Sequence, residues 1–249
     1  PLDEFASMKL QEELPSQQWL NGQKHYVETL SENDKNYLKL YSINGDRTLN
    51  AFIRNGFKMS EDDIDYIEAN MSEFQQTFDK FAEKNDVTDI LVLNTGGPPI
   101  IEFGKITNED WNKYHNQLFV GFCMLLQKIK VNDGGYIFAI TSNVIKEPNA
   151  KLIISSAYRA AFSSVFKILS KDFASRNISM INIAPGPINT DRTKELVDNV
   201  GEYADSLPMQ RLGEPEEIGN FVSSIVEKEI KYLSGAVINF DGSNSNFIF

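Results

Sequence analysis

The stretch LVLNTGGPP at residues 91–99 decides the fold, because a run of large apolar residues leads directly into a turn of glycines and prolines. An uninterrupted apolar run of this length is typical of a strand that is buried on both faces of a parallel sheet. Gly96-Gly97-Pro98-Pro99 requires a sharp turn, so the strand ends near Asn94. The stretch therefore predicts a buried parallel strand followed by a loop at its carboxyl end.

Working outward from this stretch, short apolar runs alternate with amphipathic segments of helical period. This alternation is typical of a doubly wound α/β fold of the Rossmann type, in which helices cover both faces of a parallel sheet. The helix predicted to begin at Pro215 has its proline at a favoured early position. The predicted strands are 37–43, 64–68, 90–93, 136–140, 178–183 and 236–240, and the predicted helices are 48–55, 71–83, 109–130, 155–176 and 215–227.

Composition limits the function classes. The chain has 249 residues, 41% hydrophobic and 24% charged, which is ordinary for a globular protein, and a single domain over 1–249 is the simplest interpretation. A net charge of -11 argues against nucleic acid and anionic membranes as partners. The single cysteine, Cys123, excludes an intramolecular disulfide. With no signal peptide and no long apolar run, we expect a cytoplasmic protein without a metal site.

A doubly wound sheet binds its ligand beyond the carboxyl ends of its strands. Three such ends carry polar or turn-forming residues, and we expect them to border one crevice that takes a small-molecule ligand. Without any ligand, the same residues would serve only to end a strand and reverse the chain. The three ends are Asn94-Thr95-Gly96-Gly97, Thr141-Ser142-Asn143 and Ala184-Pro185-Gly186.

Several motifs, in order and at matching spacing, resemble the short-chain dehydrogenase/reductase family in its GGPP variant. The resemblance covers residues 37–249, while 1–36 diverge. It implies a seven-stranded Rossmann-type fold and a dimer or tetramer formed through the helices at 108–130 and 155–175. The motifs are LVLNTGGPP at 91–99, Asp110-Trp111, GGYIFAITS at 134–142, ISSAYRAAF at 154–162, INIAPGPINTDR at 181–192, RLGEPEEIGNFV at 211–222 and YLSGAVINFDG at 232–242.

The resemblance also assigns the four catalytic positions, where the family has Asn, Ser, Tyr and Lys. They fall on Leu118, Ser142, Ser155 and Arg159, so that only the serine is kept. A serine hydroxyl is much less acidic than a tyrosine, and Ser155 is therefore a poor replacement for the family's proton donor. Arg159 keeps a positive charge and can hydrogen-bond a ribose or an anion, but its guanidinium does not deprotonate near neutral pH.

Further positions border the expected crevice. Tyr158, three residues after Ser155 on the same helix, is displaced around the helix and either approaches the crevice or packs at an interface. By the resemblance, Asn94, Gly96 and Thr190 line a nucleotide site, and Asn70 occupies the usual aspartate position near adenine. Segment 192–210 matches the family's substrate-covering helices and is either a lid or a packed amphipathic helix.

The glycines that a dinucleotide requires are missing at the expected positions. Matching the segment at 22–34 to the helix after the family's phosphate turn places Gln17, Asn21 and Gln23 at the three glycine positions. The corresponding first strand, 10–14, carries two adjacent acidic residues, so the first β-α unit is altered. We therefore expect no cofactor, and NAD(P) would bind only through a changed loop.

Three hypotheses follow. The first is a family member without ordinary hydride transfer, acting as a binding, regulatory or structural subunit, alone or with an active paralogue. The second is a working NAD(P)-dependent reductase with an altered site that uses Ser142, Tyr158 and Arg159. The third is a nicotinamide-free lyase similar to the halohydrin dehalogenases, which have Ser and Arg at the positions of Ser142 and Arg159. The losses at the catalytic and glycine positions favour the first.

Overall fold

The computed structural model describes residues 87–248 and the backbone of two strands at 38–43 and 64–68. These described residues belong to one compact unit, Leu38–Phe249. The expectations for residues 1–36, for the helices at 48–55 and 71–83, and for Asn70 lie outside the described residues. No described helix is long and apolar enough to cross a membrane.

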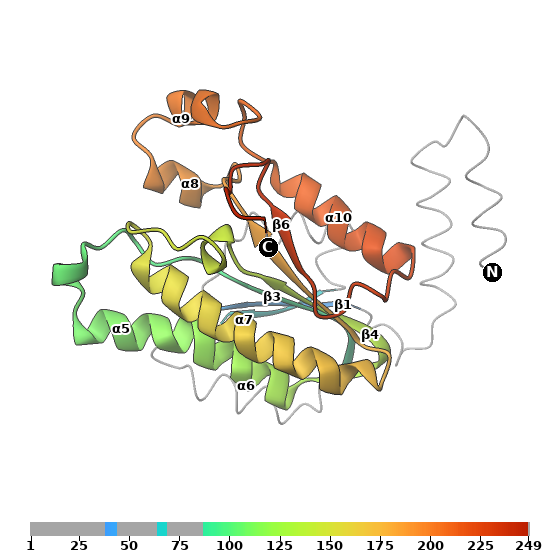
Figure 1. Ribbon diagram of the computed structural model, residues 1–249. Coiled ribbons are helices and arrows are strands. Elements are labelled where there is room, and N and C mark those ends of the chain that lie inside the picture. Colours follow the sequence, from blue (N-terminus) through green and yellow to red (C-terminus); the bar gives the residue numbers. More distant parts are fainter. Residues whose placement is uncertain (1–37, 44–63, 69–86, 249) are drawn as a thin grey trace, which may run out of the picture. The chain divides into compact units, whose positions relative to one another are not determined.

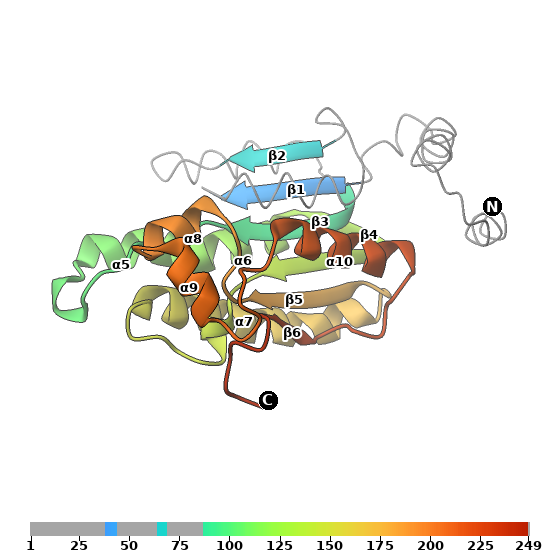
Figure 2. The ribbon, with the colours of Figure 1, turned by 90° about the horizontal axis from the view of Figure 1, so that it is seen from above.

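The described strands form one six-stranded parallel sheet in the order β2-β1-β3-β4-β5-β6. Figure 2 shows the strands side by side with their arrowheads at the same edge of the sheet. The doubly wound α/β prediction is therefore confirmed. The strands are β1 (Leu38–Ile43), β2 (Ile64–Glu68), β3 (Val87–Thr95), β4 (Lys130–Ile140), β5 (Ser179–Pro185) and β6 (Val237–Phe240).

Strand β1 lies between β2 and β3, and Leu38 pairs with Ile64 on one side and Ile90 on the other. The chain winds outward from β1 to β2 and then crosses back to β3, so the winding direction reverses between β1 and β3. A ligand crevice in such a sheet lies at this reversal. The described strand that borders this reversal beside β3 is Leu38–Ile43. The expected first strand at 10–14 and the glycine positions matched at 17–23 lie outside the described residues.

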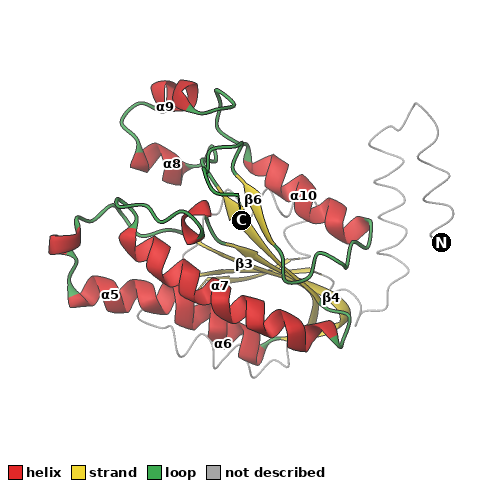
Figure 3. Cartoon of the chain, in the orientation of Figure 1, coloured by secondary structure: helices red, strands yellow, loops and turns green. Residues whose placement is uncertain are grey.

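Helices cover both faces of the sheet (Figures 1 and 3). Helices α5, α6 and α7 lie on one face, and α10 lies on the other, with α8 and α9 beyond the strand ends on the side of α10. The helices are α5 (Asn108–His115), α6 (Gly121–Lys128), α7 (Ile153–Ala174), α8 (Asp191–Leu196), α9 (Val200–Ser206) and α10 (Pro215–Glu227). Short helical turns occur at η3 (Phe103–Lys105), η4 (Asn116–Val120) and η5 (Asn143–Ile145).

The helix predicted at 109–130 is interrupted in its middle. Between α5 and α6, η4 is a π-helical turn over Asn116–Val120. Such a turn carries one extra residue and shifts the side chains that follow around the helix axis. It falls on the segment that contains Leu118, the family's asparagine position.

The hydrophobic core between the sheet and helices α6 and α7 fixes the position of α7. Phe122 on α6 and Phe162 on α7 are almost fully buried, and their ring centroids lie 4.8 Å apart. Phe166 continues the same row, with its ring 5.7 Å from that of Phe162. Each buried aromatic ring removes a large apolar surface from water, so this row of rings stabilises the packing of α7 against the sheet.

Candidate functional site

A cavity of about 650 Å³ lies at the carboxyl ends of β3, β4 and β5. Loops after all three strands contribute to its wall, and the first turns of α7 form another side. This is the place that the topology predicts for a ligand. Of the residues expected at the site, Asn94, Gly96, Ser142, Ser155, Arg159 and Thr190 line the cavity.

Tyr158 is placed elsewhere and is not among the residues that line the cavity. Its hydroxyl donates a hydrogen bond to the backbone carbonyl of Trp111 at 3.2 Å. Its ring lies 5.8 Å from that of Trp111 and 5.3 Å from that of His115, centroid to centroid. Burial raises the pKa of its hydroxyl. Tyr158 therefore packs between α7 and α5 within the chain and does not approach the cavity, and its place at a subunit interface stays a prediction.

Arg159 lies at the family's lysine position and is only 6% exposed. Its Nη1 donates to the carbonyl oxygen of Ile140 at 3.1 Å, and its Nη2 donates to that of Thr95 at 3.0 Å. The guanidinium thus joins the ends of β3 and β4. Burial, with a further contribution from the positive charge of Arg192, lowers the pKa of Arg159 to about 10. The side chain therefore remains charged at neutral pH.

Arg192, which sequence analysis did not single out, also lines the cavity. Its Nη2 donates to the carbonyl oxygen of Pro98, and its Nη1 lies 3.2 Å from a carboxylate oxygen of Glu195. The guanidinium also lies against Gly97, where an added Cβ would sit 3.4 Å from Nε. Arg192 therefore connects the loop after β5 to the glycine-proline loop after β3. The only signal in the sequence was its place just after Thr190.

Two serine hydroxyls border the cavity. Ser142 begins η5, where its Oγ accepts a hydrogen bond from the backbone N–H of Val144 at 3.4 Å and lies 3.3 Å from Oδ1 of Asn143. Ser155 lies in the first turn of α7 and is 6% exposed. The hydroxyl of Ser155 can donate a hydrogen bond to a ligand carbonyl, and that of Ser142 can do so in exchange for its bond to Asn143.

The polar residue near the family's asparagine position is Gln117. The π-helical turn directs its side chain toward β3, where Nε2 donates to Oγ1 of Thr95 and to the carbonyl oxygen of Gly96, both at 3.0 Å. Leu118 is fully buried in an apolar cluster with Tyr114 and Ile154. Gln117 therefore holds the loop that carries Gly96, a role that motif spacing alone did not reveal.

A chain of hydrogen bonds, buried between Thr141 and Asn182 and partly buried at Ser163, connects the strand ends to α7. Thr141 Oγ1 donates to Oδ1 of Asn182 at 2.6 Å, and Nδ2 of Asn182 donates to Oγ of Ser163 at 3.0 Å. The Ser163 hydroxyl in turn donates to the backbone carbonyl of Arg159 at 2.8 Å. Hydrogen bonds that are shielded from water are electrostatically stronger than exposed ones. This chain of hydrogen bonds therefore fixes the position of the helix that carries Ser155 and Arg159.

Segment 192–210 forms the outer wall. Leu196, Val197 and Tyr203 line the cavity from α8, α9 and the link between them. This placement is compatible with both interpretations of the segment, a lid and a packed amphipathic helix. Burial raises the pKa of Tyr203, so its hydroxyl keeps its proton at neutral pH. Among the described tyrosines it is the one that lines the cavity.

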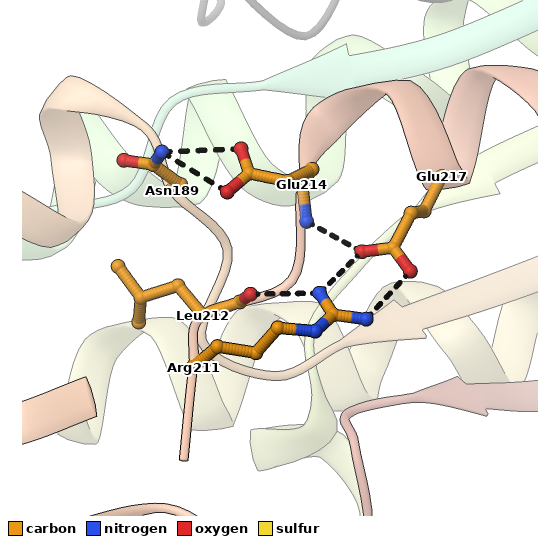
Figure 4. Close-up of polar contacts among 5 residues, drawn as sticks. All are labelled: Asn189, Arg211, Leu212, Glu214 and Glu217. Atoms are coloured by element: carbon orange, nitrogen blue, oxygen red, sulfur yellow. Dashed lines mark hydrogen bonds and ion pairs between the residues drawn. The ribbon is translucent and has the colours of Figure 1, made fainter. Parts of the chain in front are cut away.

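A polar cluster braces the loop between α9 and α10 (Figure 4). Arg211 donates through Nη1 and Nη2 to the two carboxylate oxygens of Glu217 at 2.7 and 2.9 Å. The same carboxylate accepts the backbone N–H of Glu214 at 2.8 Å, and Nδ2 of Asn189 donates to Glu214. These contacts hold the pKa of Glu217 at about 2. The cluster links the loop after β5 to the start of α10.

The C-terminal segment closes one side of the cavity, which Asn244 and Asn246 line. The backbone N–H and the side-chain amide of Asn246 each donate to the carboxylate of Glu147 at 3.0 Å. These hydrogen bonds lower the pKa of Glu147. The segment after β6 is thereby fastened to the loop after η5.

Comparison with known proteins identifies the family. A family model described as enoyl-(acyl carrier protein) reductase matches residues 67–243. The NADPH-dependent reductase BacG of Bacillus subtilis is 28% identical over 69% of this chain and 72% of its own length. The 3-oxoacyl-[acyl-carrier-protein] reductase FabG of Chlamydia muridarum is 30% identical over 66% of this chain and 68% of its own. The chain belongs to the short-chain dehydrogenase/reductase family.

A solved structure supports the same fold. A doubly substituted short-chain dehydrogenase/reductase of Serratia marcescens superposes with a TM-score of 0.70 at 21% identity, covering 84% of this chain and 98% of that one. The match extends over nearly the whole of the solved protein. The Rossmann-type fold expected from the motifs is therefore confirmed.

The relatives correct two expectations. We expected a binding, regulatory or structural subunit without ordinary hydride transfer, and no cofactor. The similar proteins are reductases, and one is named for its use of NADPH, so the comparisons favour the alternative of a working oxidoreductase. The expectation of no cofactor rested on the glycine positions matched at 17–23 and on a first strand at 10–14, all of which lie outside the described residues. The strand that pairs with β3 is Leu38–Ile43.

Proposed function

We propose that this member of the short-chain dehydrogenase/reductase family is an NAD(P)-dependent oxidoreductase that reduces a small carbonyl compound. The observation that carries the proposal is the cavity at the strand ends, where Ser142, Ser155 and Arg159 lie together. Ser142 keeps the family's residue, and Arg159 keeps the positive charge of the family's lysine. The similarity to the reductases BacG and FabG supports the same activity.

The described wall of the cavity fits the nicotinamide end of a dinucleotide. Gly96 and Gly97 allow a ligand to approach the backbone closely, and Asn94 and Thr190 add polar groups. Arg159 and Arg192 also line the cavity, and their guanidinium groups are suited to an anionic ligand. NADPH or NADH would supply the hydride in this reaction.

The residues of the chain bind and orient the carbonyl group. The hydroxyl of Ser142 exchanges its bond to Asn143 for one to the carbonyl oxygen of the substrate, as hydroxyl donors do where negative charge develops. Arg159, fixed by the carbonyls of Thr95 and Ile140, stabilises that charge from a buried position. A low-dielectric site strengthens both effects.

Tyr203 supplies the proton in this proposal. Ser155 has replaced the family's tyrosine, and the hydroxyl of Tyr158 is bound to Trp111 outside the cavity. Tyr203 reaches the cavity wall from α9, and its raised pKa keeps the phenol protonated. A phenol is a stronger acid than a serine hydroxyl, and it is therefore the better proton donor.

A titration with NADPH and NADH tests the cofactor. We expect quenching of protein fluorescence and a higher unfolding temperature with one or both, because a ligand that binds only the folded state stabilises it by mass action, by roughly 2.7 kcal/mol at a hundredfold excess over Kd. Adenosine at the same concentration serves as the control. If neither dinucleotide changes the unfolding temperature, the proposal is wrong.

A matched pair of variants tests the proton donor. Tyr203→Phe removes the hydroxyl at the cavity, and we expect kcat for carbonyl reduction to fall about 100-fold or more, in the range of general acid catalysis. Tyr158→Phe removes a hydroxyl of the same kind that lies outside the cavity, and kcat should stay within about twofold. Equal effects of the two substitutions would remove Tyr203 from the mechanism.

We also propose that the chain acts in the cytoplasm and assembles as a dimer or tetramer through α5, α6 and α7. The resemblance to the family, whose members assemble through the matching helices, supports this assembly. Sedimentation of the purified chain tests the assembly. A monomer at every concentration would contradict it.

A further inference from the structure

The starting observation is a buried positive charge. A guanidinium carries five N–H donors, and the contacts of Arg159 to Ile140 and Thr95 use two of them. No carboxylate of the described chain forms an ion pair with Arg159. The side chain is nonetheless only 6% exposed, and it lines the cavity. Its charge is therefore without a counter-ion in the part of the chain that the structure describes.

A second positive charge lies on the same cavity. Arg192 is close enough to disfavour the charged form of Arg159. Its own ion pair is with Glu195, whose side chain is 68% exposed, so water screens that pair. Among the described residues, the one carboxylate that lines the cavity is that of Glu147, and it already accepts two hydrogen bonds from Asn246. The described lining therefore carries two positive charges and one negative charge, in a chain with a net charge of -11.

This arrangement costs free energy unless a ligand offsets it. A buried charge without a partner loses its hydration, and a neighbouring charge of the same sign adds repulsion. Perturbed groups of this kind are concentrated at binding and catalytic sites. A planar or tetrahedral oxyanion matches the fork of N–H donors on a guanidinium and would satisfy both arginines at once.

We propose that this cavity binds an oxyanion, a carboxylate or a phosphate, between the guanidinium groups of Arg159 and Arg192. The hydroxyl of Thr190, at the same wall, is a further donor. The oxyanion belongs either to the compound that is reduced or to the cofactor. Its binding does not depend on reductase activity and is measured without any reaction.

Thermal unfolding of the full chain in sodium phosphate, pyrophosphate or citrate tests the proposal, with sodium chloride at equal ionic strength as the reference. We expect at least one oxyanion to raise the unfolding temperature in a saturable way. Arg192→Met, on a partly exposed helix, should raise the apparent Kd for the oxyanion about tenfold or more. Arg159→Met should do the same where it folds, and Arg159→Lys should restore part of the affinity.

Arg176→Met is the control. That arginine binds Asp133 and the backbone of Val131 at the amino end of β4, away from the cavity. The oxyanion affinity of this variant should match the wild type. If no oxyanion exceeds chloride, or if the Arg192 and Arg176 variants respond equally, the proposal is wrong.

Repeating the titration with saturating NADPH identifies the source. A phosphate effect that disappears when NADPH is present assigns the site to a cofactor phosphate. A citrate effect that persists assigns it to the carboxylate of the compound that is reduced. If NADPH itself does not bind, the proposed cofactor use is wrong. The effect of oxyanions on the unfolding temperature of the free protein still tests the oxyanion site.

Discussion

Arg159 donates a hydrogen bond from Nη2 to the backbone carbonyl of Thr95, a residue 64 positions earlier in the chain, at 3.0 Å. Its Nη1 does the same with Ile140 at 3.1 Å. A lysine has one terminal nitrogen and cannot reproduce this fixed fork. Arginine at the family's lysine position therefore links two strand ends through hydrogen bonds and keeps the positive charge.

Restoring the family's catalytic pair should increase carbonyl reduction. Ser155→Tyr combined with Arg159→Lys places a phenol and an ammonium at the positions that the family uses, and Ser155 already lines the cavity. We expect NADPH oxidation with small carbonyl substrates to rise by roughly 100-fold, the lower end of general acid catalysis. Steady-state kinetics of the double variant measures this.

The matched control for the double variant is Ser155→Phe with Arg159→Lys. It carries the same ring and the same ammonium but no hydroxyl. Its rate should stay at or below that of the wild type, because lysine keeps the charge of Arg159 but loses its two fixed hydrogen bonds. If the tyrosine and phenylalanine variants are equally active, the added phenol does not reach the substrate.

The sheet could be predicted from sequence because apolar runs of strand length have a direct physical cause. The strands at 90–93 and 136–140 lie within β3 and β4, which extend them with polar residues that the run did not include. The interruption of the helix at 109–130 could not be predicted. It accompanies contacts of Gln117 with Thr95 and Gly96, which are distant in sequence.

The walls of the site were predictable because the carboxyl ends of parallel strands meet at one edge. Asn94, Ser142 and Gly186 therefore lie at one cavity. The direction of the Tyr158 side chain was not predictable, because a residue at this position of the helix can point either toward the cavity or toward a neighbouring helix. Arg192 was missed because its role depends on how close α8 lies to the loop after β3. The spacing of residues along the sequence does not reveal that distance.

Thr141→Val should destabilise the protein at the strand ends. The variant keeps the shape of the side chain but leaves buried Oδ1 of Asn182 without the donor that lies at 2.6 Å. We expect the free energy of unfolding to fall by about 1–3 kcal/mol, the cost of an unsatisfied buried polar group. Urea denaturation measures it. Ser164→Ala, which removes an exposed helix hydroxyl, should change stability by less than about 0.5 kcal/mol.

Glu217→Gln should remove a stabilising contribution that depends on pH. The folded-state pKa of Glu217 is about 2, below the ordinary value of a glutamate. The contribution is therefore complete above the ordinary glutamate pKa of about 4.3 and is lost as the pH falls toward 2. Because the carboxylate is 40% exposed, screening limits it to about 1 kcal/mol.

Denaturation of wild type and the Glu217→Gln variant at pH 7 and pH 3 measures this contribution. The difference between the two proteins should be smaller at pH 3. Glu102→Gln, which breaks an exposed pair with Lys105, is the control and should show no resolvable difference at either pH. A Glu217 effect that does not change with pH would contradict the assignment to this ion pair.

Gly186→Ala should displace the cavity wall. The backbone N–H of Gly186 donates to the carbonyl oxygen of Phe240 at 3.0 Å, and a Cβ at residue 186 would lie 2.6 Å from Cβ and 2.9 Å from Cα of Asp241. Backbone atoms of β5 and β6 must separate to admit it, so we expect a loss of about 1–3 kcal/mol of stability and weaker NADPH binding. Gly104→Ala, where an added Cβ meets nothing within 4 Å, is the matched control and should change neither. Wild-type stability in the Gly186 variant would mean that the two strand ends separate without cost.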